Sequence, residues 1–304
     1  MAFAWVQSLW TRFWHVPVRA ERLALLRVLL GVFLLTDQLY QYLPYLAEFY
    51  GPHGVSPDGL HDWYALKKWY WTLLFFHTDN LTAIRVVFGL WMAVTFAFTI
   101  GWHTRLMNVF LWVLTQCFLN RNLDILNGGD YILLLTIFLL MFAPSGRAFS
   151  LDALRRRRAG ALPQPNLIPA WPVRVLQLQM CMIYCTSGLV KLQGDGPFRG
   201  TWWDGSSVHY VLNNLLMSRV SYVQLPIPYW ITAAMTYVCV WWEVLFPMVL
   251  SRKTRRWALW FGVLFHLGIL FSIEIGWFSF YSLMLYAVWI PDEFWTRRQG
   301  AKED

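Results

Sequence analysis

Charged residues are scarce in this sequence: only 14% of the 304 residues are Asp, Glu, Lys or Arg, against about 25% in a soluble domain. Hydrophobic residues make up 58% of the chain and aromatic residues 18%. This composition excludes a water-soluble core under a charged surface. Tryptophan and tyrosine suit the headgroup region of a bilayer, because their rings are apolar with one polar tip. We therefore expect an integral membrane protein.

Motifs of metal and phosphate sites are also lacking. There is no HExxH, no CxxC and no glycine-rich phosphate loop, and the histidines show no metal-ligand spacing on one helix. Cys181 and Cys185 are one helical turn apart, but no histidine or carboxylate accompanies them there. We interpret them, with Cys117 and Cys239, as small buried apolar residues. We predict no bound metal.

The net charge of +8 does not indicate nucleic acid as a partner. The basic residues lie in short clusters between long apolar segments, as orientation signals do in multispanning proteins. We expect membrane lipids as the partner, with the arginine run at 155–158 near anionic headgroups. The N-terminal segment has no small-residue cleavage site after an apolar core, so we expect no cleavable signal peptide. Residues 2–15 instead form a Trp-rich amphipathic stretch.

Long apolar runs predict the fold class. A spanning helix needs about 20 mostly apolar residues, and lipid cannot satisfy free backbone groups, which favours helices. We predict an all-α, polytopic membrane bundle of about eight transmembrane helices. The predicted spans are 23–43, 81–100, 106–119, 131–142, 173–190, 229–250, 257–273 and 277–290. Two aromatic, Gly- and Pro-rich segments, 44–80 and 192–228, form an outer cap of loops in this prediction.

The basic residues also predict an orientation. With the N-terminus in the cytoplasm, 17 Lys and Arg residues fall inside and 7 outside, as the positive-inside rule requires. Both termini are then cytoplasmic, and Lys191 faces outward. We expect one membrane domain over 1–304, with an interfacial segment at 1–20, the bundle at 21–291 and a cytoplasmic tail at 292–304. A bacterial inner membrane is the expected location.

Ionisable residues within apolar spans are costly and usually face a bundle interior or a wet cavity. The residues of this kind are Arg27, Asp37, Asp130, Lys191, Glu243, His266 and Glu274. Lys191 ends a predicted helix, and two interpretations stay open: a lysine reaching the headgroups, or a desolvated amine that acts as a base. Glu243 and His266 lie within predicted spans and serve either as site residues or as packing groups between helices.

An aromatic and acidic segment follows Lys191. It is TWWDG, with Trp202, Trp203 and Asp204. One interpretation places the tryptophans at the interface and the Asp-Gly pair in a turn. The other makes the tryptophans the walls of a site for a flat apolar ligand, with Asp204 orienting Lys191.

Five stretches, in order, resemble the horizontally transferred transmembrane (HTTM) domain family, whose best-known members are the vitamin K-dependent gamma-glutamyl carboxylases. The stretches are LRVLLGVFLLTDQLYQYL, NGGDYILLLTIFLLMFAPSGRAFSLD, SGLVKLQGDGPFRGTWWDG, WWEVLFP and FHLGILFSIEIGWFSFYSLM. The resemblance covers roughly residues 10–295. Each motif alone is weak, and the series is more specific to the family than to carboxylase activity.

The resemblance implies a site and a chemistry. In the carboxylases a lysine pair ends this helix, and its second lysine is the base for the hydroquinone; Lys191 matches that lysine and Val190 stands in place of the first. The implied catalytic residues are Lys191, His266 and Glu243. The implied binding residues for a reduced, vitamin K-like quinone are Trp202, Trp203, Asp204, Asp130 and Tyr131. A family histidine two residues before the tyrosine is replaced here by Gly129.

Three functions follow from these observations. In the first, the chain is a carboxylase-like enzyme of the carbon–carbon lyase and epoxidase type, using lysine-assisted proton chemistry on a quinone-like lipid and a secreted peptide. In the second, it is a non-catalytic membrane factor for maturation or export of a small secreted peptide. In the third, it carries small molecules or lipids, although no paired broken helices or repeat symmetry support this.

Overall fold

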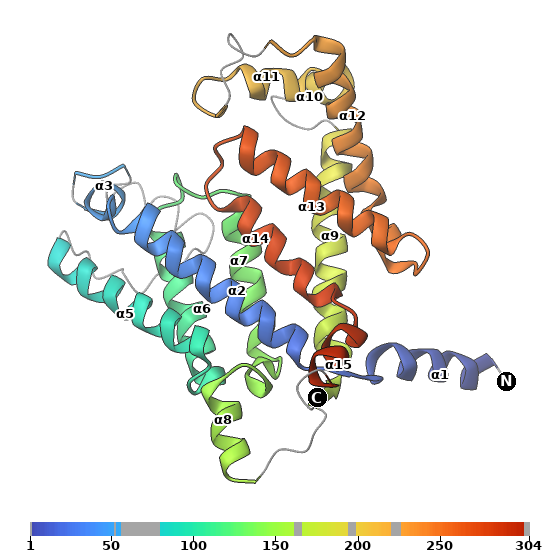
Figure 1. Ribbon diagram of the computed structural model, residues 1–304. Helices are drawn as coiled ribbons and strands as arrows, with labels where there is room; N and C mark the ends of the chain where they lie inside the picture. Colours follow the sequence, from blue (N-terminus) through green and yellow to red (C-terminus); the bar gives the residue numbers. More distant parts are fainter. Residues whose placement is uncertain are drawn as a thin grey trace. The chain divides into compact units, whose positions relative to one another are not determined.

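A computed structural model describes residues 2–51, 53–55, 80–160, 166–193, 199–219 and 226–300. This described part of the chain is mostly helical (Figure 1), with one short antiparallel ribbon that pairs Val18 with Ile168. It divides into two compact units, one made of Met1–Leu176 and Phe280–Asp304 and the other of Gln177–Ser279. The all-α membrane bundle predicted from the sequence is confirmed as a fold class, and its description as one domain stays a prediction.

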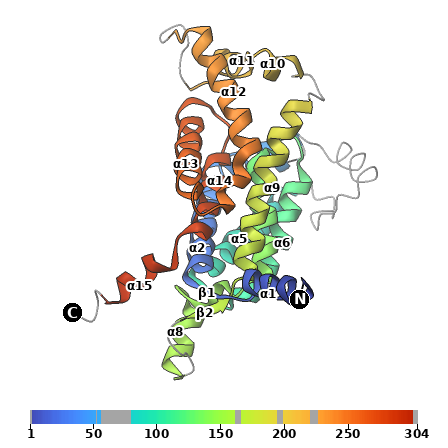
Figure 2. The same ribbon diagram turned by 90° about the vertical axis from the view of Figure 1, so that its right-hand side faces the viewer.

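The first unit contains most of the N-terminal half. Its elements are α1 (Ala2–Trp14), β1 (Pro17–Arg19), α2 (Glu21–Asp37), the π-helical η1 (Gln38–Tyr42), α3 (Leu46–Tyr50), α5 (Leu81–Ile100), α6 (Thr104–Arg121), α7 (Gly128–Met141), η3 (Ser145–Arg147), α8 (Leu151–Arg158), β2 (Leu167–Pro169), η5 (Leu285–Trp289) and α15 (Asp292–Gly300). Helices α2, α5, α6 and α7 pack successively on one another. Figure 2 shows β1 and β2 beside α1.

The second unit contains the segment that the sequence singles out. Its elements are most of α9 (Trp171–Gln193), α10 (Arg199–Trp203), α11 (Ser207–Asn213), α12 (Tyr229–Leu245), η4 (Phe246–Leu250), α13 (Arg255–Ser272) and the start of α14 (Phe278–Met284). Helices α10 and α11 both pack on α12. The predicted cap residues 52, 56–79, 194–198 and 220–225 lie outside the described residues.

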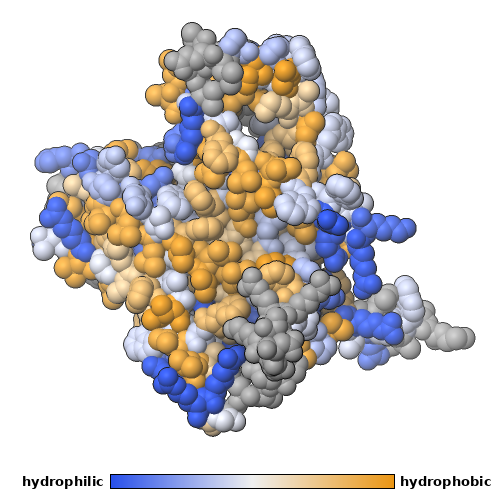
Figure 3. Space-filling view, in the orientation of Figure 1, coloured by the Kyte–Doolittle hydropathy of each residue, from blue (hydrophilic) through white to orange (hydrophobic). Residues whose placement is uncertain are grey.

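Four helices in the described part of the chain are long and apolar enough to cross a bilayer. They are Glu21–Tyr42, Leu81–Ile100, Trp171–Gln193 and Tyr229–Leu250. The other four predicted spans also lie on helices, but as membrane spans they stay predictions. Large apolar side chains are exposed on the helices of both groups. Examples are Val86 on α5, Met182 on α9 and Phe271 on α13. Figure 3 shows such apolar residues over much of the visible surface, as expected for side chains that face lipid.

Arg27 and Asp37, ten residues apart on one span, have separate partners within the first unit. The fully buried Arg27 donates hydrogen bonds to the carbonyl oxygens of Ser145 (2.7 Å) and Phe149. Asp37 accepts one from the hydroxyl of Tyr281. Main-chain oxygens therefore take the place of a carboxylate for Arg27.

Asp152, on the arginine-rich α8, caps the first turn of α6. Its carboxylate accepts hydrogen bonds from the backbone N–H of His103 (3.0 Å) and from the N–H and hydroxyl of Thr104 (both 2.7 Å). Partial burial alone raises the pKa of Asp152, but the hydrogen bonds from Thr104 and His103 and the charge of Arg156 outweigh it and lower the pKa below its usual value. The cap thus joins α8 to the start of α6.

This cap predicts a pH-dependent contribution to stability. Because the pKa of Asp152 is lower in the folded chain, its contribution is fully present above the ordinary carboxyl pKa and is lost as pH falls through the lowered value. Asp152→Ala, which removes the cap, should destabilise the protein by about 0.5–2 kcal/mol at neutral pH. Thermal unfolding should be measured between about pH 7 and about pH 3. The difference in unfolding temperature between Asp152→Ala and the unmodified protein should become smaller as the carboxyl group protonates. A difference that stays constant over this range would contradict the assignment.

Candidate functional site

Helices α9 and α12 approach closely at Gly188. A Cβ atom added there would lie 2.7 Å from the backbone nitrogen of Val244 and 3.0 Å from the Cβ of Glu243. Small residues at such positions let helix backbones come together in membranes. Because Lys191 follows Gly188 by nearly one helical turn, the same approach brings its side chain to α12.

Lys191 forms an ion pair with Glu243 across these two helices. Its Nζ lies 2.6 Å from Oε1 and 2.5 Å from Oε2 of Glu243. The exposed fractions of the two side chains are 19% and 7%. Their surroundings therefore screen the charges poorly, and each charge depends on the other for compensation. The Lys191 amine is therefore partly buried and bound to a carboxylate, and its role as a base stays a prediction.

Two further groups contact the Lys191 ammonium. The ring of Trp202 has its centroid 4.7 Å from Nζ, within the range of a cation–π interaction. The buried thiol of Cys239 lies 3.9 Å from Nζ and 3.9 Å from Oε1 of Glu243. The ammonium is thus surrounded by a carboxylate, an aromatic face and a polarisable sulfur.

Hydroxyl groups on α12 hold the backbone of the TWWDG segment. Tyr237 donates to the carbonyl oxygen of Trp203, Tyr229 to that of Asp204, and Thr236 to that of Gly205, each at 2.9 Å. Gly205 has φ of +83°, which a residue with a side chain adopts at a cost. This anchored turn fixes the end of α10, where the Trp202 ring meets Lys191.

Trp203 and Asp204 lie differently from Trp202. The indole N–H of Trp203 donates to the carbonyl oxygen of Leu192 (2.9 Å), and 60% of the residue is exposed. Asp204 is exposed, and its carboxylate accepts a hydrogen bond from the backbone N–H of Ser206 (2.8 Å). The carboxylate that orients Lys191 is therefore Glu243, and Asp204 shapes the turn before α11.

His266 is fully buried on α13 and belongs to an aromatic cluster. Its Nε2 forms a hydrogen bond with the hydroxyl of Tyr184 on α9. Tyr184 precedes Lys191 by seven residues, about 10 Å along the helix axis. The rings around His266 and Tyr184 are Trp242, Phe246, Phe265 and Phe278. His266 thus contacts the same helix as the ion pair but at another level.

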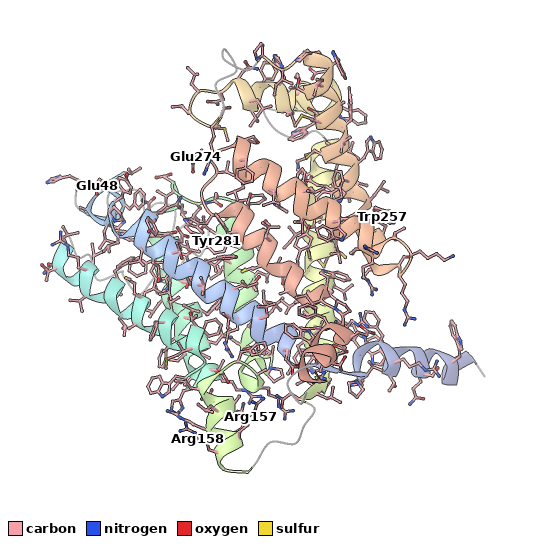
Figure 4. The ribbon with its side chains drawn as sticks, viewed as in Figure 1. Glu48, Arg157, Arg158, Trp257, Glu274 and Tyr281 are labelled. Carbon is pink, nitrogen blue, oxygen red and sulfur yellow. The ribbon has the colours of Figure 1, made fainter. Side chains whose placement is uncertain are left out.

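The remaining candidates lie outside α9 and α12. Asp130 and Tyr131 begin α7 in the first unit, where the Asp130 carboxylate accepts a hydrogen bond from the Asn127 backbone in a capping box. Glu274, labelled in Figure 4, forms an exposed ion pair with Arg219 (2.7 Å). In the described part of the chain, no three His, Cys, Asp or Glu residues gather as metal ligands.

Glu243 was singled out from the sequence, but the polar stripe on α12 to which it belongs was missed. Its members are Tyr229, Thr232, Thr236, Cys239 and Glu243. Spacings of three and four residues place them on one face of a helix. Thr232 contacts His209 (3.2 Å), and the other four serve the TWWDG segment or the ion pair. This periodicity is visible in the sequence and could have identified the face.

Comparison with known proteins gives one match. The model of the HTTM domain matches residues 15–295, which is most of the chain and includes every candidate residue. No curated protein and no solved structure matches.

The ion pair predicts strong energetic coupling between its members. Lys191→Met or Glu243→Gln alone should each destabilise the protein by about 3–5 kcal/mol, because each leaves a buried charge without its partner. The free energy of unfolding of the double variant should fall by clearly less than the sum of the two single decreases. Glu274→Gln is the matched control, since its pair with Arg219 is exposed and such pairs contribute about 0–1 kcal/mol. Additive losses in reversible unfolding experiments would rule out the coupling.

The close approach of α9 and α12 predicts that Gly188 does not tolerate a methyl group. Gly188→Ala should destabilise the protein by about 1–3 kcal/mol, because the new Cβ meets backbone that must shift. Gly268→Ala on α13 is the control, because nothing lies within 4 Å of a Cβ there. That variant should be stabilised by roughly 0.5–1 kcal/mol through helix propensity. Equal unfolding temperatures for the two variants would contradict the packing argument.

Proposed function

Because the chain belongs to the HTTM domain family, we propose that it is a gamma-carboxylase-like membrane enzyme whose Lys191–Glu243 pair performs proton chemistry on a quinone-like lipid. The observation that carries this proposal is the ion pair itself. A buried lysine and carboxylate between apolar helices are costly, and intramembrane ionisable groups are by default candidates for function.

The chemistry of the pair follows from its geometry. With Nζ 2.6 Å from Oε1 of Glu243, a proton can pass directly from the ammonium to the carboxylate. Glu243 then holds that proton, and the neutral amine of Lys191 becomes the base. A general base must lie within hydrogen-bond reach of the proton it removes, so the substrate hydroxyl is placed beside Nζ or the Glu243 oxygens.

The residues present fit a reduced quinone. Such a group supplies, when bound, an acidic hydroxyl on a flat ring and the oxidation chemistry of that ring. The indole of Trp202 offers an aromatic face 4.7 Å from Nζ, and the exposed indole of Trp203 offers a second apolar surface on the same segment. Lys191 has three N–H donors; Glu243 engages two of them, and the weak acceptor Cys239 lies 3.9 Å from Nζ. A ligand oxygen can replace the thiol as acceptor of the third N–H.

The charge distribution supports a location and a partner. The excess of Lys and Arg in alternate loops supports cytoplasmic termini and a Lys191 site that faces outward across a bacterial inner membrane. An outward site is accessible to a secreted peptide. The proposed reaction class is therefore carboxylation of a peptide glutamate: molecular oxygen oxidises the hydroquinone to its epoxide and water, the glutamate γ-proton is removed, and carbon dioxide adds to the resulting carbanion.

A non-catalytic role in maturation or export of a secreted peptide is the second candidate. Both oxygens of Glu243 bind Lys191, and such a bidentate clasp also serves to hold two helices together. In this role the pair stabilises the protein and turns over no substrate. The two candidate functions therefore differ when residue 191 cannot release its proton: the enzyme loses its activity, and the non-catalytic factor keeps its function.

Lys191→Arg separates the two functions. Arginine keeps the ion pair but cannot act as a base. With added vitamin K hydroquinone, consumption followed by mass spectrometry should fall to background in Lys191→Arg, while the unfolding temperature changes little. Consumption at the unmodified rate in this variant would remove the enzymatic proposal. If the unmodified protein does not consume the hydroquinone, the enzymatic proposal is wrong and the maturation role is the candidate that remains.

Quinone binding is tested apart from activity. Lipid extracts of the purified protein should contain quinone, and Trp202→Ala should reduce its amount several-fold because the aromatic face is lost. Trp257→Ala is the matched control, since Trp257 is 75% exposed on α13 (Figure 4). Equal quinone content in both variants would overturn the assignment of Trp202.

A further inference from the structure

A second buried carboxylate lies in the first unit, outside the Lys191 cluster. Asp37 ends α2 and is 2% exposed. Its Oδ2 accepts a hydrogen bond from the hydroxyl of Tyr281 at 2.6 Å; Tyr281 lies on α14, is 1% exposed and is labelled in Figure 4. Its other oxygen, Oδ1, is buried without a hydrogen-bond partner among the residues that the structure describes. Buried polar atoms are almost always paired, so Oδ1 calls for an explanation.

The backbone changes form immediately after Asp37. The α-helix passes into the π-helix η1, in which the backbone N–H of Leu43 bonds to the carbonyl of Gln38 at 2.8 Å. Such π turns occur frequently at functional sites. Gln38 is fully buried, and its Nε2 donates to the hydroxyl of Thr95 (3.1 Å). Within the described part of the chain, its Oε1 has no hydrogen-bond partner, so two neighbouring residues each have one unsatisfied acceptor oxygen there.

No cation among the described residues forms an ion pair with Asp37. Arg27, on the same helix, is about 15 Å away along the axis and is bound to main-chain oxygens. The titratable groups recorded around Asp37 are Asp130 on α7, Tyr281 on α14, Tyr42 on η1 and Tyr50 on α3. These four groups are neutral or acidic. The cation Arg121 acts electrostatically on Tyr50 but is not among the groups that act on Asp37.

An ionised Asp37 would thus be a buried charge with one neutral hydrogen-bond donor. Removing a carboxylate from water without a counter-charge is so costly that the group binds a proton instead. Oδ1 is the oxygen available for that proton, because Tyr281 occupies Oδ2.

We propose that Asp37 is an exchangeable proton-binding site: Oδ1 takes up and releases one proton, and Tyr281 holds the carboxyl group in place through Oδ2. The site is an acid–base group in addition to the Lys191–Glu243 pair. It rests on residues of the first unit alone, so it holds whether or not the pair is catalytic.

Infrared difference spectroscopy tests this site directly. The protein in lipid nanodiscs should show a carbonyl stretching band of a protonated carboxylic acid that disappears as pH is raised. The band should be missing in Asp37→Asn, which keeps the size of the side chain. It should persist in Glu48→Gln, which removes an exposed carboxylate of the same unit (Figure 4). Identical carboxylic acid bands in Asp37→Asn and the unmodified protein would overturn the proposal.

Tyr281→Phe gives a second, independent outcome. Its hydroxyl donates to the carboxylate form, and a hydrogen bond to a charged group is worth enough to shift a titration by about 1–2 pH units. The pH at which the band disappears should rise by that amount. An unchanged midpoint would show that Tyr281 does not hold the carboxyl group. If Asp37→Asn cannot be purified in folded form, the shift of the titration midpoint in Tyr281→Phe tests the proposal by itself.

A metal cation is the competing occupant, and the same titration distinguishes it. The midpoint should be the same in sodium chloride and in choline chloride if the site binds only protons. A lower midpoint in sodium chloride would mean that Na⁺ displaces the proton, and the proton-site proposal would be wrong in its ligand.

Discussion

The second unit depends on one ion pair placed where water is scarce. Lys191 and Glu243 come from different helices, and neither side chain has a comparable charged partner in the described contacts. In a medium of low polarity each charge alone would be strongly unfavourable. Pairing them restricts α9 and α12 to one relative depth, and Gly188 keeps the two backbones close enough for the pair to form.

Much of the fold follows from composition and apolar run length. The membrane class and the helices were predictable, because a bilayer leaves the backbone few alternatives. The number of membrane spans was less predictable. Helices α6 and α13 each have 18 residues, and length alone does not show whether helices of this size cross the bilayer. The short ribbon of β1 and β2 was not predicted, since three-residue strands leave hardly any periodic signal.

The site could be predicted in part. Lys191, Glu243 and Trp202 stand out as polar or aromatic residues at unusual places, and the structure brings these three together. Their pairing could not be predicted, because sequence spacing says nothing of contacts between helices. Asp204 misled for a related reason: its side chain is satisfied locally by the backbone of Ser206, a turn contact that needs no lysine. The role of Gly188 emerges only when the neighbouring backbone is in place.

The attachment of the TWWDG segment has a consequence for variation. Tyr229, Thr236 and Tyr237 bind main-chain oxygens of Trp203, Asp204 and Gly205. Since these three hydrogen bonds are to the backbone, they can form with other side chains at positions 203 and 204. Among the described hydrogen bonds, exchange there removes only those between the Trp203 indole and Leu192 and between the Asp204 carboxylate and Ser206. Substitutions at positions 203 and 204 can thus change which ligands this segment contacts while its backbone stays bound to α12.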